Sequence, residues 1–259
     1  SLLPVATAQN RLLSLKSPLP SEQVPLVEAV GRWLSADVGA TRNQPSADLS
    51  AMDGYAIRFG DLPGPWRIVD TSVAGGPMPA PVDAGCAVRI FTGAPLPPGT
   101  DTVIIQEDVA VDGDILNLTD LPPALIGRHV RPKGNDFEEG QVLLKAGTRV
   151  AAPHIAVAAL GGLTSLPVFQ RPRIALLSTG SELVEPDGLI PPGKLPASNG
   201  LMLQAMLSPF PCEVTDLGIV QDDLDAMTAL LRKAGDADII VTSGGASVGD
   251  HDLVRPALA

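Results

Sequence analysis

The segment Arg173–Leu177, RIALL, constrains the fold more than any other stretch of this chain, because it is nearly continuously apolar. A strand with one solvated face alternates apolar and polar residues, whereas a strand buried on both faces of a parallel sheet does not. Two further strands are predicted after it, at Val214–Val220 and Asp238–Thr242. The chain is therefore expected to contain a parallel sheet that other elements cover on both faces.

Helical patterns separate these three strands. The first helix is expected to begin at Ser198 or Asn199, as a cap, and to run through Met206. The second has Asp222 as its expected N-cap and an apolar stripe along one face. This β-α-β-α-β order predicts a doubly wound α/β domain over residues 169–259. One more strand and helix normally complete such a domain, so we expect this one to be cut short at its C-terminal end.

Residues 40–140 have a different sequence pattern, in which short apolar stretches are separated by proline and glycine. Proline and glycine number 26 each, so the sequence itself fixes many loops. Strands at this spacing favour a compact β-barrel or sandwich module. We expect them at residues 55–57, 66–69, 86–91, 102–106 and 115–118.

Short elements flank this module. Before it, a helix is expected over residues 5–15 and a strand over residues 24–30. After it, a strand at residues 142–144 precedes a helix near residues 153–161.

Bulk properties exclude several classes of protein. The net charge of −11 argues against nucleic-acid binding, which needs a basic surface. Cys86 and Cys212 stand far apart, which indicates neither a zinc site nor a disulfide framework, and we expect both to be small buried apolar residues. No apolar run approaches the roughly 18 residues of a membrane span, and no signal-peptide pattern opens the chain. A cytoplasmic protein without membrane contact is the resulting expectation.

Two strands of the α/β region lead into small polar loops. Ser178, Thr179 and Gly180 end one strand, and Ser243, Gly244 and Gly245 end another. Ligands bind at the carboxyl ends of such strands, where backbone N–H groups and hydroxyls can donate to an anion. Neither loop has the lysine of a phosphate-binding P-loop, so tight turns between strand and helix are the alternative interpretation.

Carboxylates lie in or beside these loops and in the β-rich module. Hard oxygen ligands of this kind suit magnesium, which one or two carboxylates and a phosphate usually hold. Asp222 has the alternative of a helix cap, Asp136 that of a solvated turn, and Asp53 that of a loop entering a strand. The three histidines show no metal-ligand spacing. The carboxylates in question are Asp53, Asp136, Glu182, Asp222, Asp250 and Asp252.

Five motifs follow one another along the chain: SAMDGYAIR (50–58), VRIFTGAPLPPGTDTVIIQED (88–108), RPKGNDFEEG (131–140), LLSTGSEL (176–183) and TSGGASVGDHD (242–252). SAMDGYA and FTGAPLP are the most specific of them. In this order the motifs resemble a known family, the molybdopterin molybdenumtransferases, which include bacterial MoeA and the gephyrin E domain. The resemblance runs from about Val24 to the last residue.

The resemblance implies a reaction and an architecture. Adenylylated molybdopterin and molybdate give molybdenum cofactor and AMP, with magnesium. The subunit has a discontinuous extended domain (1–39 and 141–168), an inserted β-barrel-like module (40–140) and the incomplete molybdopterin-binding α/β domain (169–259). Two subunits form an elongated homodimer, in which the α/β domain of one faces the inserted module of the other across a cleft.

The resemblance also implies roles for single residues. Asp53, Glu182 and Asp252 are the expected catalytic residues, and Glu182, Asp222 and Asp252 are the expected magnesium ligands. Asp53 and Asp136 complete the site from the other subunit. The expected substrate-binding residues are Thr92, Asp136, Ser178, Thr179, Gly180, Ser243, Gly244 and Gly245.

The sequence departs from the family pattern at its end. The 259 residues up to Ala259 do not include the lysine-bearing loop and the C-terminal β-domain of the family. Weak or no transferase activity is therefore expected of these residues alone. A molybdopterin adenylyltransferase and molybdoenzymes or their chaperones are candidate partners. The alternative function is a non-catalytic scaffold of the gephyrin type, which could lose Asp53, Glu182 and Asp252. All three are present, which favours the enzyme. A related adenylyltransferase is a third candidate, against which the SAMDGYA motif argues.

Overall fold

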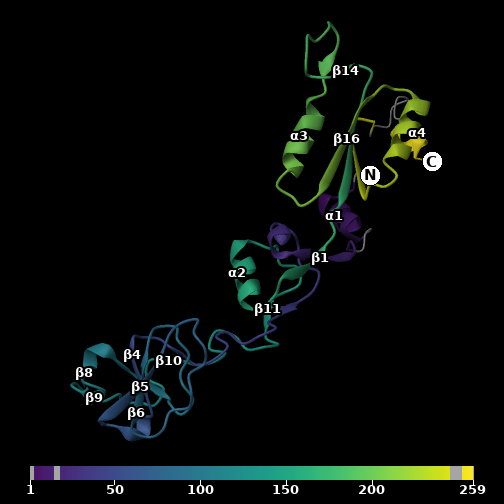
Figure 1. Ribbon diagram of the computed structural model, residues 1–259. Helices are drawn as coiled ribbons and strands as arrows, with labels where there is room; N and C mark the ends of the chain where they lie inside the picture. Colours follow the sequence, from purple (N-terminus) through teal and green to yellow (C-terminus); the bar gives the residue numbers. More distant parts are fainter. Residues whose placement is uncertain (1–2, 15–17, 246–252, 259) are drawn as a thin grey trace. The chain divides into compact units, whose positions relative to one another are not determined.

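The computed structural model describes residues 3–14, 18–245 and 253–258 and shows mixed α/β content (Figure 1). Its contacts divide the chain into two compact units. The β-unit consists of residues 37–145 and 153–164, and the α/β-unit consists of residues 1–36, 146–152 and 165–259. The three-domain boundaries that the family resemblance implies remain a prediction.

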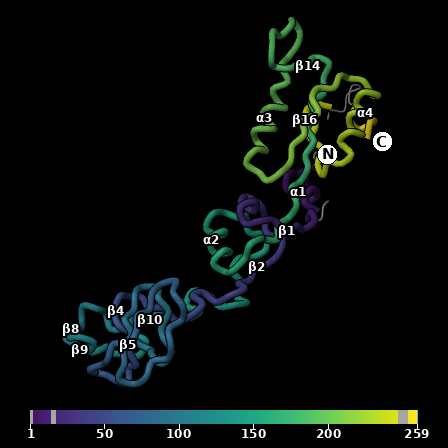
Figure 2. The backbone as a smooth tube through the Cα atoms, viewed as in Figure 1, coloured from purple at the N-terminus to yellow at the C-terminus, as the bar shows by residue number. Residues whose placement is uncertain are grey.

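One six-stranded sheet organises the β-unit, in the order β7-β4-β6-β5-β9-β8. Figure 2 traces the backbone of this unit and labels β4, β5, β8 and β9. Its packing side chains include Trp66, Leu116 and Ile104, which are all but fully buried. The five strands predicted in this region are confirmed, while β8 was missed. The strands are β4 (Gly54–Ile57), β5 (Trp66–Ser72), β6 (Cys86–Ile90), β7 (Thr102–Ile105), β8 (Val109–Asp112) and β9 (Ile115–Leu118).

Two small ladders and a helix complete the β-unit. β2 (Val38–Gly39) pairs with β11 (Val142–Leu144), and β3 (Leu49–Ser50) pairs with β10 (Val130–Arg131). The predicted helix near residues 153–161 is confirmed as α2 (Ala152–Leu160). Two 3-10 turns are present at Phe59–Asp61 and Gln106–Asp108.

The α/β-unit contains three parallel strands in the order β16-β13-β17. Two helices, α3 and α4, lie on opposite faces of this sheet (Figure 1). Burial is nearly complete along the central strand β13, as predicted, and decreases in its two neighbours. The elements are β13 (Arg173–Thr179), β14 (Leu183–Val184), β15 (Leu195–Pro196), α3 (Ser198–Leu207), β16 (Glu213–Val220), α4 (Leu224–Lys233), β17 (Ile239–Ser243) and α5 (Val254–Ala257).

Both predicted helix caps are wrong by one or two residues. Asp223, not Asp222, caps α4, since its Oδ1 accepts from the backbone N–H of Ala226 at 2.7 Å. The N-cap of α3 is Ala197, which makes no side-chain capping bond, so neither Ser198 nor Asn199 has that role. The carboxylate of Asp222 does not cap α4 and can therefore bind other groups.

The N-terminal part of the α/β-unit departs from the predicted pattern. The helix expected first is confirmed as α1 (Val5–Ser14). The strand expected over residues 24–30 is wrong: β1 (Ser21–Pro25) ends where its partner β12 (Ser165–Phe169) begins, and Leu26–Ala29 form a 3-10 turn. Pro25 lacks an N–H group and so suits the end of a ladder.

Two further expectations concern cysteines and membranes. Cys86 and Cys212 are free, but both are half-buried, so the expectation that they are buried is wrong. None of the helices in the described ranges has the length and apolar character needed to span a bilayer.

Candidate functional site

Asp53 lies in the loop between β3 and β4, and its carboxylate accepts two hydrogen bonds from Thr92. The backbone N–H of Thr92 donates to its Oδ1 at 2.7 Å, and the Thr92 hydroxyl donates to the same oxygen at 2.8 Å. These bonds, the backbone one first, hold the pKa of Asp53 below its ordinary value, with a smaller contribution from Arg89. Asp53 is therefore an ionised carboxylate with one oxygen engaged and the other available.

Arg89 supports this loop, although it was not among the residues expected in the site. Its guanidinium lies over the rings of Tyr55 and Phe91, 5.0 and 4.8 Å from their centroids. It also donates to the carbonyl oxygen of Gly54 at 3.0 Å. Position 54 needs glycine, because a Cβ there would overlap with the backbone of Ile104 in β7. Arg89 could have been identified from the sequence, because it is the arginine in the motif that contains FTGAPLP.

Asp136 is exposed, as the solvated-turn interpretation holds, but it is paired. Arg131 Nη2 donates to both of its carboxylate oxygens, at 2.8 and 2.6 Å. This interaction lowers the pKa of Asp136 and raises that of Arg131. Arg131 belongs to β10, whose ladder with β3 leads directly into the Asp53 loop. The β-unit thus contributes two ionised carboxylates on neighbouring segments.

In the α/β-unit, the carboxyl ends of the strands carry a second acidic group. Ser181 N donates to Asp222 Oδ2 at 3.3 Å, and Asp222 N donates to Ser181 Oγ at 3.2 Å. The Glu182 carboxylate folds back over Gly180, with Oε2 2.6 Å from where a Cβ on that glycine would lie. The loop after β13 therefore connects two of the three expected magnesium ligands, Glu182 and Asp222.

The predicted substrate-binding residues of this unit fall on two faces of the sheet. Ser178 and Ser243 are register partners and share one face. Thr179 is the next residue and points to the other face, toward Gly244 and Gly245. A Cβ on Gly244 would come within 2.5 Å of Thr179 Oγ1, so the loop after β17 packs directly on Thr179.

Two of the three expected magnesium ligands, Glu182 and Asp222, lie among the residues that the structure describes. Glu182 and Asp222 are exposed and offer hard oxygen atoms, the donor chemistry that magnesium prefers. Asp250 and Asp252 lie outside the described residues. Within residues 3–14, 18–245 and 253–258, no group of three or more His, Cys, Asp or Glu side chains could hold a metal ion. Two carboxylates fit a magnesium ion whose remaining ligands are phosphate oxygens and water.

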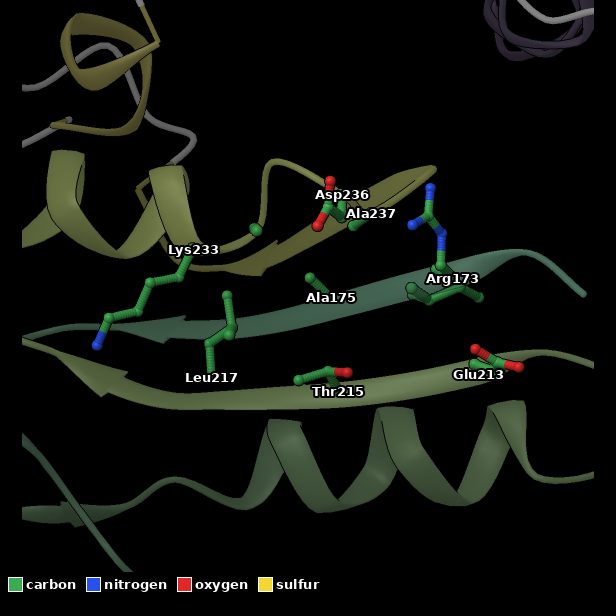
Figure 3. A pocket seen from close by; sticks show the side chains of 10 residues that line it. Arg173, Ala175, Glu213, Thr215, Leu217, Lys233, Asp236 and Ala237 are labelled. Carbon is green, nitrogen blue, oxygen red and sulfur yellow. The ribbon is translucent and has the colours of Figure 1, made fainter.

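A small pocket of about 150 Å³ lies elsewhere on the α/β-unit (Figure 3). Arg173 and Glu213, which line it, are the first residues of β13 and β16. It therefore opens near the amino ends of the strands, away from Ser178 and Asp222, and it is not the candidate site.

Comparison with known proteins gives matches over nearly the whole chain. The MoeA N-terminal region (domain I and II) matches residues 3–162, and the probable molybdopterin binding domain matches residues 175–259. The molybdopterin molybdenumtransferase of Haemophilus influenzae is 33% identical, over 99% of this chain and 64% of its own length. That of a Nostoc species is 37% identical, over 96% and 59%. The chain thus spans about three fifths of the length of these curated relatives.

Solved structures show the same fold. A molybdopterin biosynthesis MoeA protein from Pyrococcus horikoshii matches with a TM-score of 0.89 and 30% identity, over 100% of this chain and 66% of the other. A second structure of that protein matches with a TM-score of 0.84 and 31% identity, over 94% and 67%.

Proposed function

Because the chain belongs to the MoeA family, we propose that it takes part in inserting molybdenum into adenylylated molybdopterin, which releases AMP and forms molybdenum cofactor. One observation carries this proposal: relatives named molybdopterin molybdenumtransferase match 96–99% of the chain. A gephyrin-type scaffold remains the alternative from another class, but no feature of the described residues favours it.

The carboxylates of the two units would have different tasks. Glu182 and Asp222 would hold magnesium, which neutralises phosphate charge and polarises the bond that is broken to release AMP. Asp53, kept ionised by Thr92, offers its second oxygen to the substrate or to water bound at the metal. Asp136 already has a partner in Arg131, so its role is to hold that arginine near the Asp53 loop.

The acidic balance of the chain agrees with a requirement for magnesium. A net charge of −11 repels a polyanionic substrate, and a divalent cation reverses the local field. Ser178, Thr179, Ser243 and the glycine amides near them add neutral hydrogen-bond donors, which bind anionic oxygen without further repulsion.

The assembly is proposed to be a homodimer, with Asp53 of one protomer and Glu182 of its partner serving the same site. A molybdopterin adenylyltransferase would supply the substrate, because the adenylylated form must be made before molybdenum is inserted. Asp252 joins the proposed magnesium ligands and is expected to be catalytic.

The test measures AMP release from adenylylated molybdopterin by the full-length protein that contains these residues, with molybdate and magnesium present. We expect Asp53→Ala and Glu182→Ala to lower the rate at least a hundredfold while the thermal midpoint stays within a few degrees of wild type. Asp61→Ala is the matched control, since Asp61 is a carboxylate of the β-unit that accepts from Gly85 N outside the site. Rates unchanged in the first two variants would contradict the proposal and favour a scaffold.

A further inference from the structure

The first turn of α3 carries a side chain that reaches the end of a strand. Asn199 Nδ2 donates to Ser243 Oγ at 2.8 Å, which connects α3 to the last residue of β17. Asn199 is exposed, so water would satisfy its amide if this bond were absent. The bond therefore matters more for Ser243, because it fixes the position of that hydroxyl.

Ser178 lies beside Ser243 and lacks such a partner. The two residues are in parallel register, so both side chains leave the sheet on the α3 face. Ser178 is only 6% exposed, and its hydroxyl has no hydrogen-bond partner within the described part of the chain. Opposite it is Gly200, where an added Cβ would lie 3.5 Å from Ser178 Oγ. Although the residue is almost completely buried, this hydroxyl is therefore available to a ligand or water atom.

The helix turn above these serines supplies further donors. α3 is ten residues long, and its N-cap Ala197 makes no side-chain bond, so its first N–H groups can bind an anionic oxygen. Asp216 is the carboxylate nearest to Gly200, and its two oxygens already accept from Gln204 Nε2 at 2.6 Å and Gly218 N at 2.8 Å.

The direction of the Asn199 bond decides what Ser243 can offer. The amide nitrogen donates, so the Ser243 oxygen uses a lone pair and its proton stays available to an acceptor. We propose that Asn199 is a positioning residue, which holds Ser243 as a hydrogen-bond donor to an anionic oxygen of the ligand, beside Ser178. The proposal rests on the proposed function, which supplies adenylylated molybdopterin as that ligand.

A double-mutant cycle on ligand affinity tests this role. The dissociation constant of adenylylated molybdopterin is measured for wild type, Asn199→Ala, Ser243→Ala and the double variant. We expect each single variant to bind about tenfold more weakly, and the double variant to bind no more weakly than Ser243→Ala alone, because Asn199 acts through Ser243. Ser198→Ala, in the same turn, is the control and should stay within twofold of wild type.

A second variant covers the case in which Asn199→Ala changes the fold. Asn199→Asp keeps the side-chain size, but its carboxylate can only accept hydrogen bonds. Ser243 would then donate its proton to this carboxylate instead of to the ligand, so we expect at least tenfold weaker binding. The positioning role would be overturned by unchanged affinity in both Asn199 variants, or by losses in the two single variants that multiply in the double variant. In either case, binding of the ligand by the wild-type chain would leave the proposed function standing. No binding by the wild-type chain would overturn both.

Discussion

The carboxylate of Asp53 receives two hydrogen bonds on one oxygen, from a residue 39 positions later in the chain. The sequence alone left open whether this carboxylate is merely solvated in a loop. The geometry gives it a defined partner, and the same partner keeps it charged. The loop interpretation and the functional one are therefore compatible, because Asp53 directly precedes β4 and is also tied to Thr92.

The pKa of Asp53 is the first prediction at this scale. Thr92→Ala removes the hydroxyl donor but keeps the backbone N–H, which contributes more. We expect the pKa, followed by NMR titration of the side-chain carboxyl, to rise toward its ordinary value without reaching it. Thr100→Ala is the control, since its hydroxyl donates to Pro97 O.

Stability should depend on pH with a defined sign. The folded-state pKa of Asp53 is depressed, so its contribution is present above the unfolded-state pKa and is lost as the pH falls through the folded-state pKa. The difference in unfolding free energy between wild type and Thr92→Ala should therefore shrink in acid. A difference that grows as the pH falls would contradict this assignment.

At the scale of elements, the two aspartates before α4 have separate tasks. Asp223 caps the helix, whereas Asp222 exchanges hydrogen bonds with Ser181. Asp223→Ala should lower the free energy of unfolding by about 1 kcal/mol, as loss of an N-cap does. Asp222→Ala should cost less than half of that and should instead weaken magnesium binding. Chemical denaturation and magnesium titration of both variants make the comparison, and the reverse pattern would refute it.

Elements with a strong local pattern were predictable, and those set by distant partners were not. The apolar run of β13 identified a buried central strand directly. The strand predicted over residues 24–30 failed because its true extent depends on β12, about 140 residues later, which no local pattern reveals. The cap of α4 was missed because Asp222 and Asp223 are equally good caps by residue type.

The candidate site was predictable to a similar degree. Motif resemblance pointed to Asp53 and Thr92, which the fold does bring together. Arg89 and Asn199 were missed, because the contacts of Arg89 depend on ring stacking and the role proposed for Asn199 depends on a contact between α3 and β17. Ser178 and Thr179 were grouped as one set, although strand alternation sends their side chains to opposite faces.

At the scale of the whole molecule, each unit has its own core. Trp66 packs in the β-unit with Ile57, Ala87 and Leu116, and Met227 packs in the α/β-unit with Leu177 and Leu231. Separate cores predict that calorimetry resolves more than one thermal transition.

Two core variants identify these transitions. Trp66→Ala and Met227→Ala each remove a side chain that is 1% exposed, and each should cost about 2–5 kcal/mol. We expect each variant to shift one transition and to leave the other within about 2 °C. A single transition that both variants lower alike would show that the chain unfolds as one cooperative body.

The pairing of β1 with β12 also has a consequence for biosynthesis. Ser21 leaves the ribosome long before Phe169, its ladder partner, has been translated. At about 5–20 residues per second the delay is roughly 7–30 s, ample time for the six-stranded sheet between residues 54 and 118 to form first. The nascent chain would thus hold an unpaired β1 edge while a finished sheet is already present, and this edge is the segment on which a holding chaperone would be expected to act.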